Sequence, residues 1–176
     1  MRVIIVIAVF VLFNQTFAQA PDVKEPVSDA LQKVSVMIGT WEGRGWVINQ
    51  NREKKSSNVH ESIQWKLDST LILIEGTGTD DNGIVVHNAL AVLGFDPFQK
   101  SYSMNSYLSS GLSTTADFKV LIENESFSWI INNKRGRTIK YTITINKDNQ
   151  WKEIGEYSAD NEKWNQFFEM NLKKVN

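Results

Sequence analysis

Apolar and polar residues alternate along most of this chain, in short runs separated by clusters of turn-forming residues. Segment 62–67 has apolar side chains at its odd positions and polar ones at its even positions, and segments 139–145 and 168–173 repeat the pattern. Alternation with a period of two gives a β-strand one face for a core and one face for water. The chain is therefore predicted to be all-β and antiparallel.

Turn-forming residues recur at even intervals from Thr40 onward. They lie near positions 49–52, 68–69, 80–83, 96–97, 109–111, 124, 135–136, 148–149 and 160–161. These nine turns define about ten strands, and no second helix-length pattern separates them, so chain neighbours are expected to pair as hairpins. Asn82-Gly83 is expected to form a primed turn with positive φ at both central residues.

Ten strands in one open sheet would leave two unpaired edges, which closure removes. We therefore predict an up-and-down barrel of the lipocalin or calycin kind, with a two-sheet sandwich as the alternative. At this strand number the interior is wider than side chains alone readily fill.

A short helix is predicted before the first strand. Val27, Leu31 and Val34 recur with Ile38 at offsets of four, three and four, which places them on one helical face. Pro26 suits the start of this helix, and Gly39 its end. We expect the helix to cap the barrel.

The first 18 residues have the organisation of a secretory signal peptide. A basic residue precedes the apolar run 3–13, which is shorter than the roughly 20 residues that span a bilayer. Cleavage is expected after Ala18, because the alternative cut after Ala20 would leave Pro21 directly behind the scissile bond. Residues 19–176 would then form one barrel domain, exported to the periplasm or secreted; a retained membrane anchor is the alternative.

Charge and cysteine content exclude several partner classes. Lys and Arg number 19 against 20 Asp and Glu, with both signs interspersed, and there is no cysteine. The sequence therefore offers no basic face for nucleic acid, no basic amphipathic helix for a membrane surface after signal removal, and no disulfide. Six Trp, nine Phe and four Tyr are the main source of apolar area for a core.

Motifs from about Met37 to the end of the chain resemble the bacterial family called domain of unknown function 1579. They are GTWEG at 39–43, QWKLD at 64–68, EGTG at 75–78, DP at 96–97, and EIGEYS at 153–158 followed by Trp164 and FFEM at 167–170. This resemblance implies a calycin-like barrel without an established activity. In lipocalin relatives the Trp of G-x-W closes one barrel end beneath a basic residue of the last strand, which implies Trp41 beneath Lys173.

The GTW-x-G opening also resembles, more distantly, the haem-binding nitrobindin barrels. These use a histidine of a late strand as the iron ligand, whereas this chain has only His60 and His87, both in its first half. Haem is therefore disfavoured, although tyrosine also serves as an axial ligand in some haem proteins. Two distant histidines without cysteine do not predict a metal site, so neither metal nor cofactor is expected.

The candidate ligand-binding residues are those whose faces would line the barrel. They are Glu61, Trp65, Glu75, Tyr102, Met104, Trp129, Tyr141 and Phe168. This choice depends on register, because a slip of one residue exchanges the two faces of a strand. Of Glu153 and Glu156, at most one can point inward.

Three functions are compatible with these residues. The leading hypothesis is a carrier of a small apolar or amphipathic molecule. The second is an enzyme with Glu61 or Glu75 as acid or base, since burial would raise the pKa of either carboxyl. The third is a structural or interaction module whose barrel is filled by its own side chains. The sequence contains no common catalytic signature, so no catalytic residue is identified.

Overall fold

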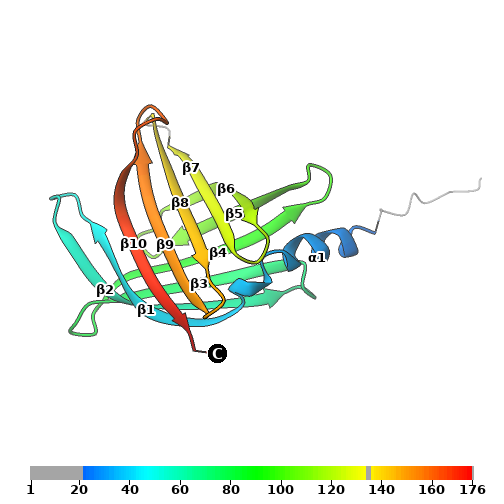
Figure 1. Cartoon of the computed structure of the whole chain (residues 1–176), viewed down its shortest axis with the longest axis horizontal. Coiled ribbons are helices and arrows are strands. Elements are labelled where there is room, and N and C mark those ends of the chain that lie inside the picture. The colour runs from blue at the N-terminus through cyan, green and yellow to red at the C-terminus, as the bar shows by residue number, and fades with distance from the viewer. Residues whose placement is uncertain (1–21, 134–135, 176) are drawn as a thin grey trace, which may run out of the picture.

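The computed structural model describes residues 22–133 and 136–175, in which ten antiparallel strands close into one barrel (Figure 1). The strands are β1 (Gly39–Ile48), β2 (Lys54–Lys66), β3 (Leu71–Thr79), β4 (Val85–Asp96), β5 (Ser101–Leu108), β6 (Ser113–Ile122), β7 (Ser126–Asn133), β8 (Arg137–Ile145), β9 (Gln150–Ser158) and β10 (Asn165–Lys174). Each pairs with its chain neighbours, and β1 also pairs with β10. The predicted up-and-down barrel is thus confirmed against the sandwich.

The proposed signal peptide lies outside the described residues. Within the part that the structure describes, no helix has the length and apolar character needed to cross a membrane.

The helix before the barrel is shorter than predicted and starts earlier. Helix α1 spans Lys24–Gln32, and a 3-10 helix, η1, spans Ser35–Met37. Pro26 lies in the first turn of α1, where a missing N–H costs no intrahelical hydrogen bond. The buried face contains Val27, Leu31 and Val34 as predicted, but Met37 takes the place expected for Ile38.

Together α1 and η1 form the cap (residues 24–37), which closes one end of the barrel. The Ala30 carbonyl accepts a hydrogen bond from the Tyr102 hydroxyl (2.6 Å), and the Lys33 carbonyl accepts one from the Asn124 backbone N–H (2.9 Å). The Val36 carbonyl accepts one from the Lys174 ammonium (3.4 Å), and the Met37 carbonyl accepts one from the Trp41 indole N–H (2.8 Å). Residues of the barrel strands and of the β6–β7 turn therefore supply donors to carbonyl groups near the ends of the two short helices.

The barrel interior beside the cap is filled by large side chains. Those with less than 2 % exposure include Trp41, Phe127, Leu31, Met37, Ile63, Ile72, Leu93 and Ile145. Trp41 also packs edge-on against Trp151, with ring centroids 5.4 Å apart. This half of the barrel is a packed core.

The basic residue over Trp41 is Lys174, not the predicted Lys173. Lys174 pairs directly with Trp41 and so shares its inward face, and its ammonium lies 5.2 Å from the Trp41 ring centroid. Lys173 pairs with Glu42 and is exposed on the outer face. The prediction missed the register by one residue, which is enough to exchange the faces.

The hairpin at Asn82-Gly83 is also not the predicted type. Only Gly83 of the two has positive φ (80°), and the Asp80 carboxylate accepts the backbone N–H groups of Asn82 and Ile84, both at 2.9 Å. This is a tight turn followed by one left-handed residue. The consecutive left-handed residues expected of a primed turn occur instead at Asp68 (54°) and Ser69 (66°).

Arg52 occupies the left-handed position of the β1–β2 hairpin (φ 63°), equivalent to Gly83 in the β3–β4 hairpin. We expect Arg52→Gly to stabilise the protein by about 0.5–1 kcal/mol, because glycine adopts positive φ without steric cost. Gly83→Ala should have the opposite sign; an added Cβ there meets no atom within 4 Å, so only the backbone changes. Urea unfolding of both variants checks this, and effects of the same sign would contradict it.

Candidate functional site

Solvent reaches the inner face of the barrel in the half away from the cap, here called the open half. Register partners share a face of the sheet, so Val59, Ala89, Trp129, Tyr141 and Phe168 all point inward. Each of them is partly exposed, although the strands close the barrel on all sides. Water therefore enters through the end opposite the cap.

Glu153 on β9 is the most buried charged residue at this site, with 5 % exposure. Its Oε1 accepts a hydrogen bond from the Trp129 indole N–H at 3.1 Å. Burial raises the pKa of Glu153 to about 7, and the indole groups of Trp129 and Trp151 limit the rise. The Trp151 N–H is buried and, among the described residues, has no partner in hydrogen-bond geometry, although it lies close enough to Glu153 to affect that pKa.

Glu61 on β2 is the second carboxyl group in the interior. It shares the inward face of its register partners Trp41 and Gly76. An added Cβ at Gly76 would lie 2.6 Å from a Glu61 carboxyl oxygen, so the carboxyl group rests directly on this glycine. Burial, and then the charge of Glu153, raise the pKa of Glu61 to about 8. Because each carboxylate disfavours ionisation of the other, the two form a coupled pair.

Aromatic rings lie beside Glu153. Trp129 stacks on Tyr141, with centroids 3.8 Å apart and planes at 6°. Burial, followed by the charge of Glu153, raises the pKa of the Tyr141 hydroxyl above its usual range. Phe167 and Phe168 present their edges to Tyr141 at centroid distances of 5.8 and 5.6 Å. Phe167 was not predicted, because a register shift between Gln166 and Phe168 inserts it into the strand.

None of the ion pairs in the described ranges includes either interior carboxyl. Lys174 lies at the cap end and donates to a cap carbonyl. Lys55, at the rim of the open half, pairs with Glu53 at 3.0 Å. Burial lowers the pKa of His87, also on the inward face near the rim, and so favours its neutral form. Among the residues that the structure describes, the carboxyl pair thus has no basic neighbour that neutralises it.

The sequence-predicted site residues fall into three groups. Trp129, Tyr141 and Phe168 pack together in the open half, and Glu61 faces the same interior from β2. Trp65, Tyr102 and Met104 face inward in the half filled beneath the cap. Glu75 was predicted to line the interior, but it is exposed on the outer face. The prediction failed because both faces of β3 are apolar, so alternation there does not show which one is inside.

Of Glu153 and Glu156, of which the sequence allowed at most one to point inward, Glu153 is the one that does. Glu156 points outward and bonds to Lys140 at 3.1 Å. The interior carboxyl pair is therefore Glu61 and Glu153. Within the described residues, no group of three or more His, Cys, Asp or Glu side chains is arranged to hold a metal ion.

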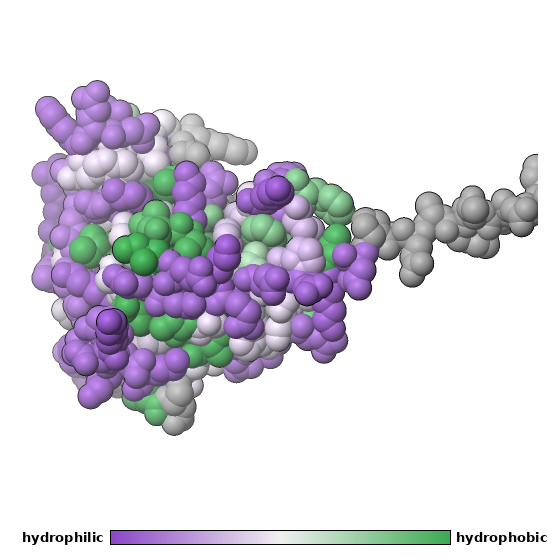
Figure 2. Space-filling model, turned by 45° about the vertical axis from the view of Figure 1, so that its right-hand side comes forward, coloured by the Kyte–Doolittle hydropathy of each residue, from purple (hydrophilic) through white to green (hydrophobic). Residues whose placement is uncertain are grey.

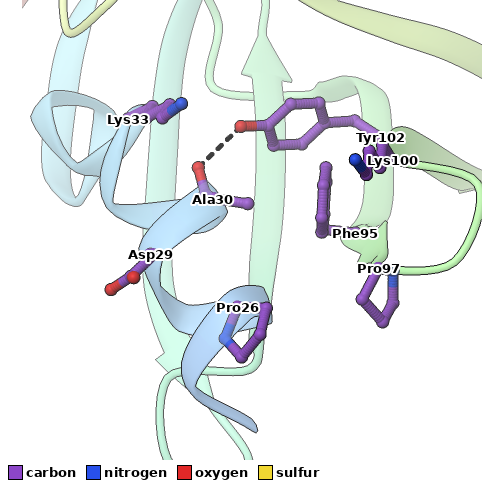
Figure 3. Close-up of a pocket in the computed structure, with 8 residues that line it drawn as sticks. All are labelled: Pro26, Asp29, Ala30, Lys33, Phe95, Pro97, Lys100 and Tyr102. Carbon is purple, nitrogen blue, oxygen red and sulfur yellow. Dashed lines mark hydrogen bonds between the residues drawn. The ribbon is translucent and has the colours of Figure 1, made fainter. Parts of the chain in front are cut away.

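A second candidate is a groove of about 450 Å³ between α1 and the β4–β5 turn (Figure 3). Its lining residues are Pro26, Asp29, Ala30, Lys33, Phe95, Pro97, Lys100 and Tyr102. The charged members are exposed, and the Tyr102 hydroxyl already donates to the Ala30 carbonyl. Because its charged groups are in water and its partly buried Tyr102 hydroxyl already has a partner, this groove is the weaker site.

Comparisons with known proteins support the fold alone. No family model and no curated protein matches the chain. The crystal structure of Rv2717c from M. tuberculosis is similar, with a TM-score of 0.62 and 12% identity over 84% of this chain and 98% of that one.

Two other solved structures are too distant to support an argument. A redesigned β-barrel has a TM-score of 0.38 at 11% identity, covering 82% of this chain and 96% of that one. A protein of unknown function from the DUF3598 family of Nostoc punctiforme has a TM-score of 0.28 at 6% identity, covering 83% and 99%. The chain is thus a closed β-barrel similar in fold to Rv2717c, and its resemblance to domain of unknown function 1579 stays a prediction from sequence motifs.

Proposed function

We propose that this protein is exported and binds a small apolar or amphipathic molecule in the open half of its barrel. The observation that carries the proposal is the partial exposure of inward-facing aromatic side chains, Trp129, Tyr141 and Phe168, inside a closed barrel. Large apolar surface that stays wet in a concave site is typical of ligand pockets. The packed half beneath the cap closes the other end.

The rim of the open half supports entry of an apolar molecule. Exposed hydrophobic side chains lie in the β3–β4 hairpin, at Ile84, Val85 and Val86, and in the β5–β6 hairpin, at Tyr107, Leu108 and Leu112. The two hairpins are neighbours because β4 pairs with β5. Figure 2 shows hydrophobic residues at the surface, gathered in patches bordered by hydrophilic ones. Clustered exposed apolar side chains commonly mark interaction or ligand sites.

Filling the open half should abolish ligand uptake. Ala89 points inward beside Gly76, whereas its neighbour Leu90 pairs with Glu75 on the outer face. We expect the neutral dye Nile red to gain fluorescence with the wild-type protein and with Leu90→Phe, but not with Ala89→Phe. Circular dichroism establishes that both variants are folded. Equal dye uptake by both variants, or none by the wild type, would contradict binding in the interior.

Native mass spectrometry of protein purified from its own host tests the ligand and the export together. A mass lacking residues 1–18 supports cleavage after Ala18. An additional mass lost on denaturation identifies a bound molecule. An intact N-terminus would argue against export, and a barrel without any bound species would argue against a carrier.

An enzyme using the barrel as a reaction chamber is the second candidate function. It is favoured by two interior carboxyl groups, the partly exposed Glu61 and the buried Glu153, whose pKa values lie close to neutrality. Glu75 no longer supports it, because that carboxylate is exposed on the outer face. Carboxyl pKa values near 4.5 for both interior residues, measured by NMR titration, would remove its basis.

A further inference from the structure

The interior carboxyl pair constrains the ligand more narrowly than the apolar lining does. We propose that the ligand of the open half carries a positively charged amine, which binds between Glu61 and Glu153 with its apolar part against the Trp129–Tyr141 stack. This inference rests on the proposed binding function and names the chemical class of the ligand.

Two indole N–H groups near Glu153 stabilise its ionised form and limit the rise in pKa that burial causes. The Trp129 N–H donates to it at 3.1 Å, and the buried Trp151 N–H, which has no partner within the described ranges, lies beside it. N–H donors directed at a carboxyl group stabilise its ionised form. An ionised carboxylate at 5 % exposure needs a counter-ion, because burying an unpaired charge is costly.

The charged groups of the described residues, 22–133 and 136–175, do not provide that counter-ion. Of the inward-facing basic residues, Lys174 is engaged with the cap and Lys55 with Glu53. Arg137, at the rim, lies 5.7 Å from the Tyr157 ring centroid. His87 is held towards its neutral form by burial, and the remaining titratable neighbour, Tyr141, is neutral at physiological pH.

The aromatic wall beside the pair suits the rest of such a ligand. Trp129 and Tyr141 are both partly exposed, so their stacked rings are accessible from the open end. Ring faces attract cations as well as apolar groups. A carboxylate next to an aromatic face therefore recognises both parts of an aryl or alkyl amine.

Binding of a cation should displace protons from the pair. Near pH 7 the carboxyl groups are partly protonated, since the pKa values of Glu61 and Glu153 are about 8 and 7. A nearby positive charge favours the ionised forms and lowers both pKa values. Amine binding should therefore release protons at neutral pH and strengthen as the pH rises from 6 to 8.

Three probes of similar size separate charge from shape: 2-phenylethylamine, 2-phenylethanol and 3-phenylpropanoate. Titration calorimetry at pH 7.5, in two buffers with different ionisation enthalpies, measures affinity and proton release. We expect the amine to bind at least about tenfold more tightly than the alcohol, the effect typical of one charge-assisted hydrogen bond. The carboxylate probe should not bind detectably.

Glu153→Gln and Glu61→Gln should each reduce the preference for the amine to within about threefold, through loss of a charged partner. Glu75→Gln, which changes an exposed outer carboxylate, is the matched control and should keep the full preference. Thermal melts followed by circular dichroism verify that each variant is folded.

An alcohol that binds as tightly as the amine would overturn this inference and leave the proposed carrier function standing. So would an amine preference that survives both interior substitutions, because the cation would then lie elsewhere. Absence of binding by all three probes together with Nile red uptake would also overturn the inference alone. Absence of both would overturn the carrier function with it.

Discussion

Replacing Glu153 with glutamine is expected to make the protein more stable above pH 7, although it alters the centre of the interior. The pKa of this carboxyl is about 7 in the folded protein, raised from 4.5 by burial. Between these values the folded state binds more protons than the unfolded state, so the free energy of unfolding falls as the pH rises. The loss is on the order of 3 kcal/mol. Glutamine avoids it and retains an oxygen that can accept the Trp129 N–H.

Urea unfolding between pH 5 and pH 8 measures this effect as the difference between wild type and variant. Glu61→Gln should show the same sign over a window extending to about pH 8, the pKa of that carboxyl. Glu75→Gln should track the wild type throughout. Taking the difference also removes the pH dependence that exposed groups contribute equally to wild type and variant. Glu53 and Asp160, whose pKa values are lowered by hydrogen bonds, are such groups. A Glu153→Gln variant less stable than wild type at pH 8 would show that the Glu153 carboxylate has a neutralising partner, which the described part of the chain does not contain.

Trp41→Ala is expected to cause the largest loss of stability in the cap half. Trp41 is fully buried, packs against Trp151, and donates its indole N–H to the Met37 carbonyl. Truncating a buried aromatic side chain costs about 3–5 kcal/mol, and the unpaired carbonyl adds about 1 kcal/mol. Trp41→Phe should cost less, because it keeps an aromatic ring and loses chiefly the hydrogen bond.

Trp46→Ala, on the same strand, is the matched control. Trp46 is partly exposed on the outer face, where the Lys54 ammonium lies 4.0 Å from its ring centroid. An exposed contact of this kind contributes about 0.5–1 kcal/mol. Denaturant midpoints of the two alanine variants give the comparison. Similar losses at both positions would show that the cap half is not the main source of stability.

The strand arrangement could be predicted because local chemistry determines it. All nine predicted turn positions coincide with the breaks between strands, since turn-forming residues and alternation act over a few residues. The end of the helix was less predictable. Asn124, which is distant in sequence, donates its backbone N–H to the Lys33 carbonyl, and Trp41, which follows the helix, donates its indole N–H to the Met37 carbonyl. These hydrogen bonds favour a 3-10 turn over a continuous helix.

The candidate site was predictable only where one strand face is clearly polar. Alternation in β2 is clean, so Glu61 was placed inside correctly, whereas β3 has Leu73 outside and Ile74 inside, and Glu75 was misplaced. The hydrogen bond between Trp129 and Glu153 joins β7 to β9, which are not adjacent strands. Pairing across a barrel interior depends on side-chain lengths and curvature, which no local pattern records.

The cap is synthesised before every residue that holds it in place. The donor to the Ala30 carbonyl, Tyr102, follows it by 72 residues, and the donor to the Val36 carbonyl, Lys174, follows it by 138 residues. The barrel itself closes only when β10 reaches β1. A growing chain therefore completes neither the contacts of the cap nor the barrel until β10 has been synthesised. A product interrupted before β10 would expose the free edges of β1 and β9, so it would aggregate or be degraded and would not persist as a partly working protein.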